Sequence, residues 1–277
     1  MPFSVGACHR MKPIHIVVAG ATGRMGQETI KMIHQEEHLK LTGAVARSHK
    51  GEDVGLAIGL NEIGVPLTNS LEEALDLGQP DVMIDLTTPE AVKKHMELAI
   101  QSGVRPVVGT SGLSEESIQE LDHQCQEREL GGIIAPNFAI GAVLMMVFAS
   151  KAAQYLPDVE IIEMHHDQKL DAPSGTAMKT AELISQKRDE RKQGHIDEKE
   201  VLEGARGGYR DGFRIHSVRL PGLVAHQEVL FGGAGQLLTL RHDSMNRQSF
   251  MPGVKLAVEK VMELKRLVYG LENVMDL

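Results

Sequence analysis

The densest group of reactive side chains in this 277-residue chain lies between Glu160 and Thr176, in the string EIIEMHHDQKLDAPSGT. A β-branched run leads to His165 and His166, and Lys169 follows in a polar loop. Histidine and lysine can both move protons in catalysis. Because adjacent side chains at a strand end point to opposite faces, we expect one histidine to face a site while its neighbour does other work.

The same string ends in Ser174, Gly175 and Thr176, where a helical pattern begins. Hydroxyls and free backbone N–H groups at a helix start suit a carboxylate. Two alternatives fit the same residues. One is a surface histidine pair beside an N-capping serine with no catalytic role, and the other is a zinc site. No third ligand stands at metal spacing, however, and Lys169 is a poor companion for a cation. We therefore predict a catalytic site that binds a carboxylate and holds no metal.

A second chemical pattern is the turn GATGRMG, from Gly20 to Gly26, between a β-branched run and a helical pattern. Small residues there let backbone N–H groups and a helix start approach a pyrophosphate. The usual G-x-G-x-x-G spacing is matched only if Ala21 replaces the first glycine. A purely structural turn could carry the same glycines, but the strand–turn–helix context favours a dinucleotide.

The end of the second predicted strand bears on which dinucleotide binds. A site for NAD usually has an acidic residue about twenty positions after the glycines. This chain has Ala46 there, followed by Arg47, with Lys50 nearby. Arg47 could pair with a 2′-phosphate, helped by Arg24 or Lys50, although a solvated basic loop would look the same. The pattern predicts NADPH as the preferred cofactor, with NADH possible.

The order of strand and helix patterns predicts two domains. Strand signals at 14–19, 41–46, 81–86, 105–109 and 132–135 alternate with helical signals, one of which has Thr88 as its N-cap and Pro89 as its first residue. This alternation is typical of a Rossmann-type, doubly wound α/β domain that binds a dinucleotide. Strands at 158–164, 215–220, 227–231 and 236–241 instead follow one another, with one helix starting near Ser174. They predict an α+β domain with a mixed open sheet.

We place the dinucleotide-binding domain at residues 1–137, completed by the C-terminal segment 248–277, with a final helix at about 252–267. The substrate-binding and oligomerisation domain takes residues 138–247. The charged run 187–203 is expected to be solvated. The uncharged stretch 131–150 is interrupted by Pro136, Asn137 and Gly141, so it predicts a buried strand, a turn and a buried helix rather than a membrane span.

Composition excludes several classes of function. The chain is 42% apolar and 24% charged, as in ordinary globular proteins. Its net charge of −9 disfavours nucleic acid and anionic membranes as partners. Six Phe, three Tyr and no Trp argue against a base-stacking surface. Cys8 and Cys125 form no pattern and the first eleven residues lack the apolar core of a signal peptide, so we expect a cytoplasmic protein.

Several strings together resemble one enzyme family. HHDQKLDAPSGTA, GATGRMG, DLTTPE, VVGTSGLS and IIAPNFAIGAVLM closely resemble the dihydrodipicolinate reductases of bacterial lysine and diaminopimelate synthesis. The resemblance runs from about Lys12 to the C-terminus. It implies reduction of a cyclic dicarboxylate imine, 4-hydroxy-tetrahydrodipicolinate, with NADH or NADPH and with loss of water. It also implies a homotetramer.

The resemblance implies roles for individual residues. His165 would donate and accept a proton and Lys169 would donate one. His166, Ser174, Gly175 and Thr176 would bind substrate, and Arg247 would face an anion. The cofactor would contact Gly20, Ala21, Thr22, Gly23, Arg24, Met25, Arg47, Thr87, Thr88, Gly109, Thr110, Ser111, Ala135, Pro136, Asn137 and Phe138. Many members have a glutamate where this chain has Ala46, which agrees with the NADPH prediction.

Two other functions fit parts of the sequence. Another dehydrogenase of an amino-acid pathway would share the two-domain plan, but would lack the S-G-T helix start after paired histidines. A sensor that binds NADP and signals through partners would need none of the His165, Lys169 and Ser174 cluster, and would not turn over NADPH.

Overall fold

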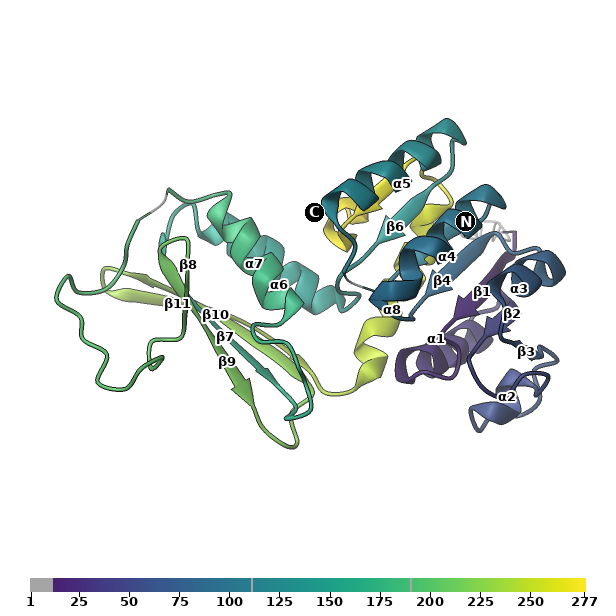
Figure 1. The fold of residues 1–277 in the computed structure, drawn as a ribbon. Coiled ribbons are helices and arrows are strands. Elements are labelled where there is room, and N and C mark those ends of the chain that lie inside the picture. Colours follow the sequence, from purple (N-terminus) through teal and green to yellow (C-terminus); the bar gives the residue numbers. More distant parts are fainter. Residues whose placement is uncertain (1–11, 111, 190) are drawn as a thin grey trace, which may run out of the picture. The chain divides into compact units, whose positions relative to one another are not determined.

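The computed structural model describes residues 12–110, 112–189 and 191–277 (Figure 1). The chain forms two compact units. The first contains the residues up to Ile134 together with Lys255–Tyr269. The second contains Ala135–Val254 and Gly270–Leu277. The functional labels given to the two domains remain predictions.

The first unit is built on a seven-stranded sheet in the order β12-β6-β5-β4-β1-β2-β3, and its neighbouring strands run parallel. This is the expected doubly wound α/β arrangement, because the strand order reverses beside β1. The strands are β1 (Ile14–Ala19), β2 (Leu39–Val45), β3 (Leu67–Thr68), β4 (Val82–Asp85), β5 (Arg105–Val108), β6 (Gly132–Ile134) and β12 (Leu267–Tyr269).

Helices connect these strands and bury the sheet on both faces. They are α1 (Arg24–Gln35), α2 (Val54–Ala57), α3 (Leu71–Gly78), α4 (Pro89–Gln101) and α5 (Glu115–Glu127). Val17 and Ala19 of β1 belong to an apolar cluster with α3 and α4. The alternate residues Ile16 and Val18 are also fully buried. A strand buried on both faces is typical of a parallel sheet.

The C-terminal segment differs from its prediction. Helix α8 (Met251–Val261) ends six residues before the predicted end, and Leu267–Tyr269 form β12, which pairs with β6. Residues 270–277, with the 3₁₀ helix η2 (Leu271–Val274), belong to the second unit, where Leu271 and Val274 are buried. Strands as short as β3 and β12 carry too few residues to show a period of two.

The second unit is built on the predicted mixed sheet, in the order β11-β10-β7-β9-β8. Only β7 and β9 run parallel among its paired strands. The strands are β7 (Asp158–His165), β8 (Gly208–Arg210), β9 (Phe213–Arg219), β10 (Ala225–Gly233) and β11 (Gln236–Ser244), and the helices are α6 (Ile140–Ala152), α7 (Gly175–Ser185) and the 3₁₀ helix η1 (Arg247–Phe250).

Helices α6 and α7 lie on one face of this sheet and form its core (Figure 1). Ala149, Ala177 and Ile184 from the helices pack with Ile161 and Phe231 from the strands. The segment 131–150 is the predicted buried strand, turn and helix, as β6 and α6. In the three described ranges of the chain, the structure contains no helix with the length and apolarity needed to cross a membrane. The run 187–203 is mostly exposed and forms no helix or strand where it is described.

Candidate active site

The inner face of the second sheet changes from apolar to polar along β7. Alternate residues of a strand share a face, so Val159, Ile161, Glu163 and His165 all point the same way. Val159 and Ile161 are buried in the apolar core. Glu163 and His165 follow them at the carboxyl end of the strand. The strand therefore packs in the core along its first part and carries two ionisable side chains at its carboxyl end.

Glu163 is a fully buried carboxylate with several donors. Arg219 donates to both of its oxygens, at 2.7 Å to Oε1 and 2.9 Å to Oε2. The backbone N–H of Ser174 donates to Oε1 at 3.2 Å. Burial raises the pKa of Glu163, but hydrogen bonds from His165, Arg219 and Ser217 outweigh it and lower that pKa to about 2. Glu163 is therefore ionised at neutral pH.

His165 is held by this carboxylate. Its Nδ1 lies 2.5 Å from Oε2 of Glu163, and its side chain is 14% exposed. A carboxylate on one ring nitrogen fixes the orientation of the ring and places a proton on that nitrogen. The other ring nitrogen, Nε2, remains for the pocket that His165 lines with Asn137 and Thr176. This geometry is that of an oriented proton donor.

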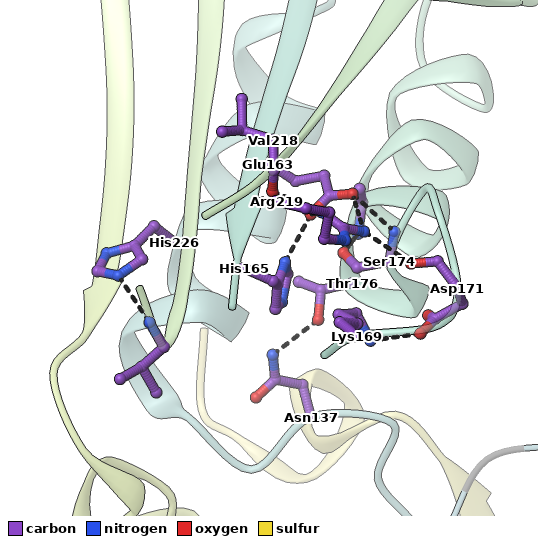
Figure 2. Close-up of polar contacts among 12 residues, drawn as sticks. Asn137, Glu163, His165, Lys169, Asp171, Ser174, Thr176, Val218, Arg219 and His226 are labelled. Carbon is purple, nitrogen blue, oxygen red and sulfur yellow. Dashed lines mark hydrogen bonds and ion pairs between the residues drawn. The ribbon is translucent and has the colours of Figure 1, made fainter. Parts of the chain in front are cut away.

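Lys169 lies in the loop between β7 and α7, and the same arginine ties this loop down. The Nζ of Lys169 lies 2.7 Å from Oδ1 of Asp171. Arg219 donates from its second guanidinium nitrogen to the backbone oxygen of Asp171, also at 2.7 Å. Figure 2 shows Glu163, Arg219, His165 and Lys169 gathered beside the start of α7. Arg219 thus connects the residue that holds His165 with the loop that carries Lys169.

The start of α7 is where an anion site is predicted, and one of its three backbone N–H groups already donates to a residue of the chain. Ser174 is the N-cap, and its hydroxyl accepts from the N–H of Ala177 at 3.2 Å while its own N–H donates to Glu163. The N–H groups of Gly175 and Thr176 have no acceptor among the described residues. A Cβ placed on Gly175 would meet nothing within 4 Å. The open N–H donors are therefore those of Gly175 and Thr176.

Two other residues predicted to bind substrate, His166 and Arg247, have fewer contacts with this group. His166 follows β7, is half-buried, and its backbone oxygen accepts from Lys169 at 3.2 Å. Arg247 opens η1, between Ser244 and Phe250, which both line the pocket with His165. Arg247 is not itself a lining residue of that pocket. The structure brings His165, Lys169, Gly175 and Thr176 together. Arg247 is not among them, although it lies in sequence between two residues that line the pocket of His165.

The glycine turn of the first unit fits a dinucleotide. Gly20 has a φ of +85°, and a Cβ there would lie 2.7 Å from the backbone oxygen of Leu86. A Cβ on Gly26 would lie 2.1 Å from the backbone oxygen of Gly20, so the turn must pack closely on α1. Gly23 is the N-cap of α1 and provides no side-chain cap. The first N–H groups of α1, at Arg24 and Met25, are therefore directed at a ligand position that suits a phosphate.

The end of β2 lies directly against this turn. The N–H groups of Gly20 and Ala21 both donate to the backbone oxygen of Val45, at 3.0 Å each. Ala46 is buried and Arg47 is exposed. Within the part of the chain that the structure describes, the Arg47 guanidinium has no ion pair or hydrogen bond, whereas Lys50 pairs with Glu73 at 3.4 Å. Arg47 thus follows the strand that holds the turn, and Arg24 lies in the turn itself, at the start of α1.

A buried carboxylate, Asp85, organises the neighbouring loops after β4 and β5. Thr87 donates to its Oδ1 from both N–H and hydroxyl, at 2.9 and 2.6 Å. Thr110 donates to the same oxygen at 3.3 Å, and Nδ1 of His95 lies 2.6 Å from Oδ2. Asp85 is fully buried. It therefore fixes two loops that carry predicted cofactor residues, Thr87–Thr88 and Gly109–Thr110.

Other predicted cofactor residues have different positions. Ser111 lies outside the described residues. Ala135, Pro136, Asn137 and Phe138 follow β6 and belong to the second unit. There, Asn137 donates from Nδ2 to the hydroxyl of Thr176 at 3.0 Å and accepts from the N–H of Ala139 at 2.8 Å. Asn137, which is predicted to contact the cofactor, is therefore hydrogen-bonded to Thr176, which is predicted to bind the substrate.

Sequence reasoning missed Glu163, Arg219 and Asp85. Glu163 and Asp85 could have been noticed by one signal, because an acidic residue inside an apolar strand requires a partner. Glu163 interrupts the run IIEMH, and Asp85 interrupts VMIDL. Their partners could not have been found, since Arg219 and His95 lie 56 and 10 residues away along the chain.

Comparison with known proteins identifies the family of the chain. The family model described as dihydrodipicolinate reductase, N-terminus, matches residues 14–138, and the model for the C-terminus matches residues 141–275. The chain belongs to the dihydrodipicolinate reductase family. It is 59% identical to the 4-hydroxy-tetrahydrodipicolinate reductase of Halalkalibacterium halodurans, over 95% of this chain and 100% of that protein. The enzyme of the same name from Geobacillus kaustophilus is 57% identical, over 95% and 99% of the two chains.

Solved structures extend the comparison to the fold. A dipicolinate-bound dihydrodipicolinate reductase from Paenisporosarcina sp. TG-14 has a TM-score of 0.84 at 54% identity, covering 95% of this chain and all of that one. An amine dehydrogenase from Mycobacterium smegmatis has a TM-score of 0.70 at 15% identity, over 95% and 96% of the two chains. The second likeness concerns the fold alone. This member of the family is a reductase with a Rossmann-type nucleotide domain.

Proposed function

We propose that this reductase catalyses the NAD(P)H-dependent reduction of 4-hydroxy-tetrahydrodipicolinate to tetrahydrodipicolinate in lysine and diaminopimelate biosynthesis. One observation carries the proposal. His165, oriented by the buried Glu163, lies in one unit with Lys169 and the open helix start at Gly175 and Thr176. Proton donors beside an anion-binding helix start are what a dicarboxylate imine needs. The dipicolinate bound by the solved relative is such a cyclic dicarboxylate.

The first role of the chain is to bind carboxylate. The N–H groups of Gly175 and Thr176 point out of the start of α7, where the helix dipole also favours negative charge. Lys169 supplies a cation on the loop before the helix. It is paired with Asp171, whose side chain is 57% exposed, so a substrate carboxylate can replace Asp171 as its partner. Binding would then order the Lys169 side chain at the substrate.

The second role is to supply the proton. Reduced nicotinamide supplies a hydride when it is bound, the substrate loses its hydroxyl as water, and one proton must be supplied to balance these two changes. His165 presents Nε2 while Glu163 holds Nδ1. Lys169 supplies a second acidic N–H on the carboxylate-binding side. The ionised Glu163 holds Nδ1, so the ring is kept in the orientation in which Nε2 can transfer a proton.

The glycine turn fits a dinucleotide, and we propose NADPH as the preferred one. The turn leaves no room for a Cβ at Gly20 or Gly26 and opens onto the N-terminus of α1. Among the described residues Arg47 has no carboxylate partner, and it follows the strand whose last carbonyl holds the turn. A guanidinium there favours a 2′-phosphate, and Ala46 offers no acidic group to a free ribose hydroxyl.

We also propose that the protein is a homotetramer and that it acts in the cytoplasm. The outer face of the second sheet carries half-buried Ile162, Met164 and Leu230, and Leu237 of β11 is 69% exposed. These apolar side chains lie among ion pairs, such as Glu160 with Arg206 and Glu228 with Arg241, and a mixed sheet face of this kind suits contact with a second subunit. Light scattering on the purified protein should give about four times the 30.3 kDa chain mass. A monomer mass would refute this part alone.

The test of the function is a direct assay. NADPH oxidation is measured with freshly generated 4-hydroxy-tetrahydrodipicolinate, in parallel with NADH. We expect turnover with both cofactors and a higher kcat/KM with NADPH. The His165→Ala, Lys169→Ala double variant should lose activity. A fully active double variant would refute the assignment of the proton donors, and a wild-type protein that binds NADPH without turnover would be a sensor.

A further inference from the structure

A row of polar residues crosses the inner face of the second sheet beside the core. Gln227 on β10 is paired directly with Glu163 on one side and with His242 of β11 on the other. Gln227, His242, His165 and Thr176 line one pocket, with a cavity of about 20 Å³. Such a volume has room for about one water-sized group.

The side-chain amide of Gln227 has a fixed orientation. Its Nε2 donates to the hydroxyl of Thr180 at 2.8 Å. That hydroxyl donates its own hydrogen to the backbone oxygen of Thr176 at 2.8 Å, so it can only accept from Gln227. Turning the amide over would place an oxygen against an oxygen that has no hydrogen to give. The identity of the two amide atoms is therefore determined by α7.

This orientation leaves the Oε1 of Gln227 without a donor. Gln227 is 4% exposed, and no described residue donates to its Oε1. A buried acceptor without a partner destabilises the folded state, so it is expected to meet a donor from outside the chain. The ring of His242 beside it is held in place by α6, because a Cβ on Gly141 would lie 2.7 Å from its Cδ2. Burial lowers the pKa of His242, so this side of the pocket is uncharged.

The proposed substrate has one group that suits this acceptor. Its carboxylates and imine nitrogen are hydrogen-bond acceptors, and they would repel Oε1. Its hydroxyl is a neutral, water-sized donor. We propose that Gln227 is a specificity-determining residue whose Oε1 accepts a hydrogen bond from the substrate hydroxyl, in the pocket that it shares with His165 and His242. This inference rests on the proposed function, and it identifies which end of the pocket recognises the hydroxylated carbon.

The test compares two stable saturated probes, piperidine-2,6-dicarboxylate and its 4-hydroxy derivative, with both epimers at carbon 4. Their inhibition constants are measured in the NADPH assay. The wild-type protein should bind one hydroxylated epimer about tenfold more tightly than the parent dicarboxylate, as expected for one hydrogen bond to a buried acceptor. In Gln227→Met, which keeps the length of the side chain and removes the acceptor, this preference should disappear.

Two further variants complete the design. Gln227→Asn keeps an amide on a side chain shorter by one carbon, so its oxygen no longer reaches the hydroxyl. It tests for loss of the same preference if Gln227→Met fails to fold. Gln186→Met is the matched control, because Gln186 is an exposed glutamine of the same unit that bonds Glu182 at 3.2 Å. The control should retain the tenfold preference.

The outcomes separate the two proposals. If the wild type is inhibited equally by the parent and both hydroxylated probes, or if the preference survives in Gln227→Met and Gln227→Asn, Gln227 does not recognise the hydroxyl while the reductase function stands. If wild type neither turns over the substrate nor binds either dicarboxylate, the proposed function fails and this inference fails with it. Loss of the preference in both Gln227 variants, with unchanged binding of the parent probe, supports the inference.

Discussion

Replacing Glu163 with glutamine should remove a large and pH-dependent part of the stability. The pKa of Glu163 falls from 4.5 to about 2 on folding, which corresponds to about 3 kcal/mol of stabilisation at neutral pH. A lowered pKa stabilises the folded state above the unfolded-state pKa and ceases to do so as the pH falls towards 2. The cost of Glu163→Gln should thus be about 3 kcal/mol at pH 7 and about 1 kcal/mol smaller at pH 3.5.

Urea unfolding at pH 7, 5 and 3.5 measures this difference. The matched control is Glu160→Gln, on the other face of the same strand, where Arg206 and His216 pair with a carboxylate that is 26% exposed. Solvent screens that cluster, so its loss should cost about 1 kcal/mol or less. Equal costs for the two variants, or a cost of Glu163→Gln that does not change with pH, would refute the reasoning.

The same variant should also impair catalysis. A glutamine amide holds Nδ1 of His165 less firmly than a carboxylate does, so the ring loses its fixed orientation and kcat should fall by about 100-fold with little change in KM. Glu160→Gln should keep the wild-type kcat. If Glu163→Gln loses stability but keeps its kcat and its pH–rate profile, Glu163 serves the fold alone.

Three other predictions concern separate groups. Lys169→Met keeps the length of the side chain and removes its charge, so kcat should fall by about 100-fold or more in steady-state assays, and a loss below tenfold would contradict its role as proton donor. Arg47→Ala should lower kcat/KM for NADPH by about tenfold and leave that for NADH nearly unchanged, whereas equal losses would contradict a contact with the 2′-phosphate. Burial raises the pKa of the Cys125 thiol to about 12. In a Cys8→Ser protein, a thiol reagent at pH 8 should therefore react only as urea unfolds the chain, and reaction with the folded protein would contradict this.

Much of the fold could be predicted because its signals are local. The strand at Ile14–Ala19 was predicted with its observed bounds, and Ser174 caps α7 where the string PSGT predicts a helix start. The predicted Thr88 cap is only partly right. Thr88 is the N-cap of α4, but its side chain does not cap the helix, and its hydrogen bond lowers the pKa of Glu90 instead.

The site was less predictable because its contacts are long-range. His165 and Lys169 could be selected by residue type, but the groups that orient them could not. Glu163 meets Arg219 only because β7 and β9 are paired in parallel, with His165 opposite Arg219. The role of Ser174 was also incomplete, since its N–H is used by Glu163 rather than left for a ligand. Such partners depend on strand register, which no local pattern contains.

The pairing of β12 with β6 has a consequence for biosynthesis of the chain. The sheet of the first unit begins at residue 14 and is completed only by residues 267–269, which are synthesised long after its other strands. Until those residues leave the ribosome, a nascent chain carries β6 with an unpaired edge, the kind of surface that promotes aggregation. The N-terminal half therefore cannot finish folding ahead of the rest, and truncation shortly before Leu267 should harm solubility out of proportion to the few residues removed.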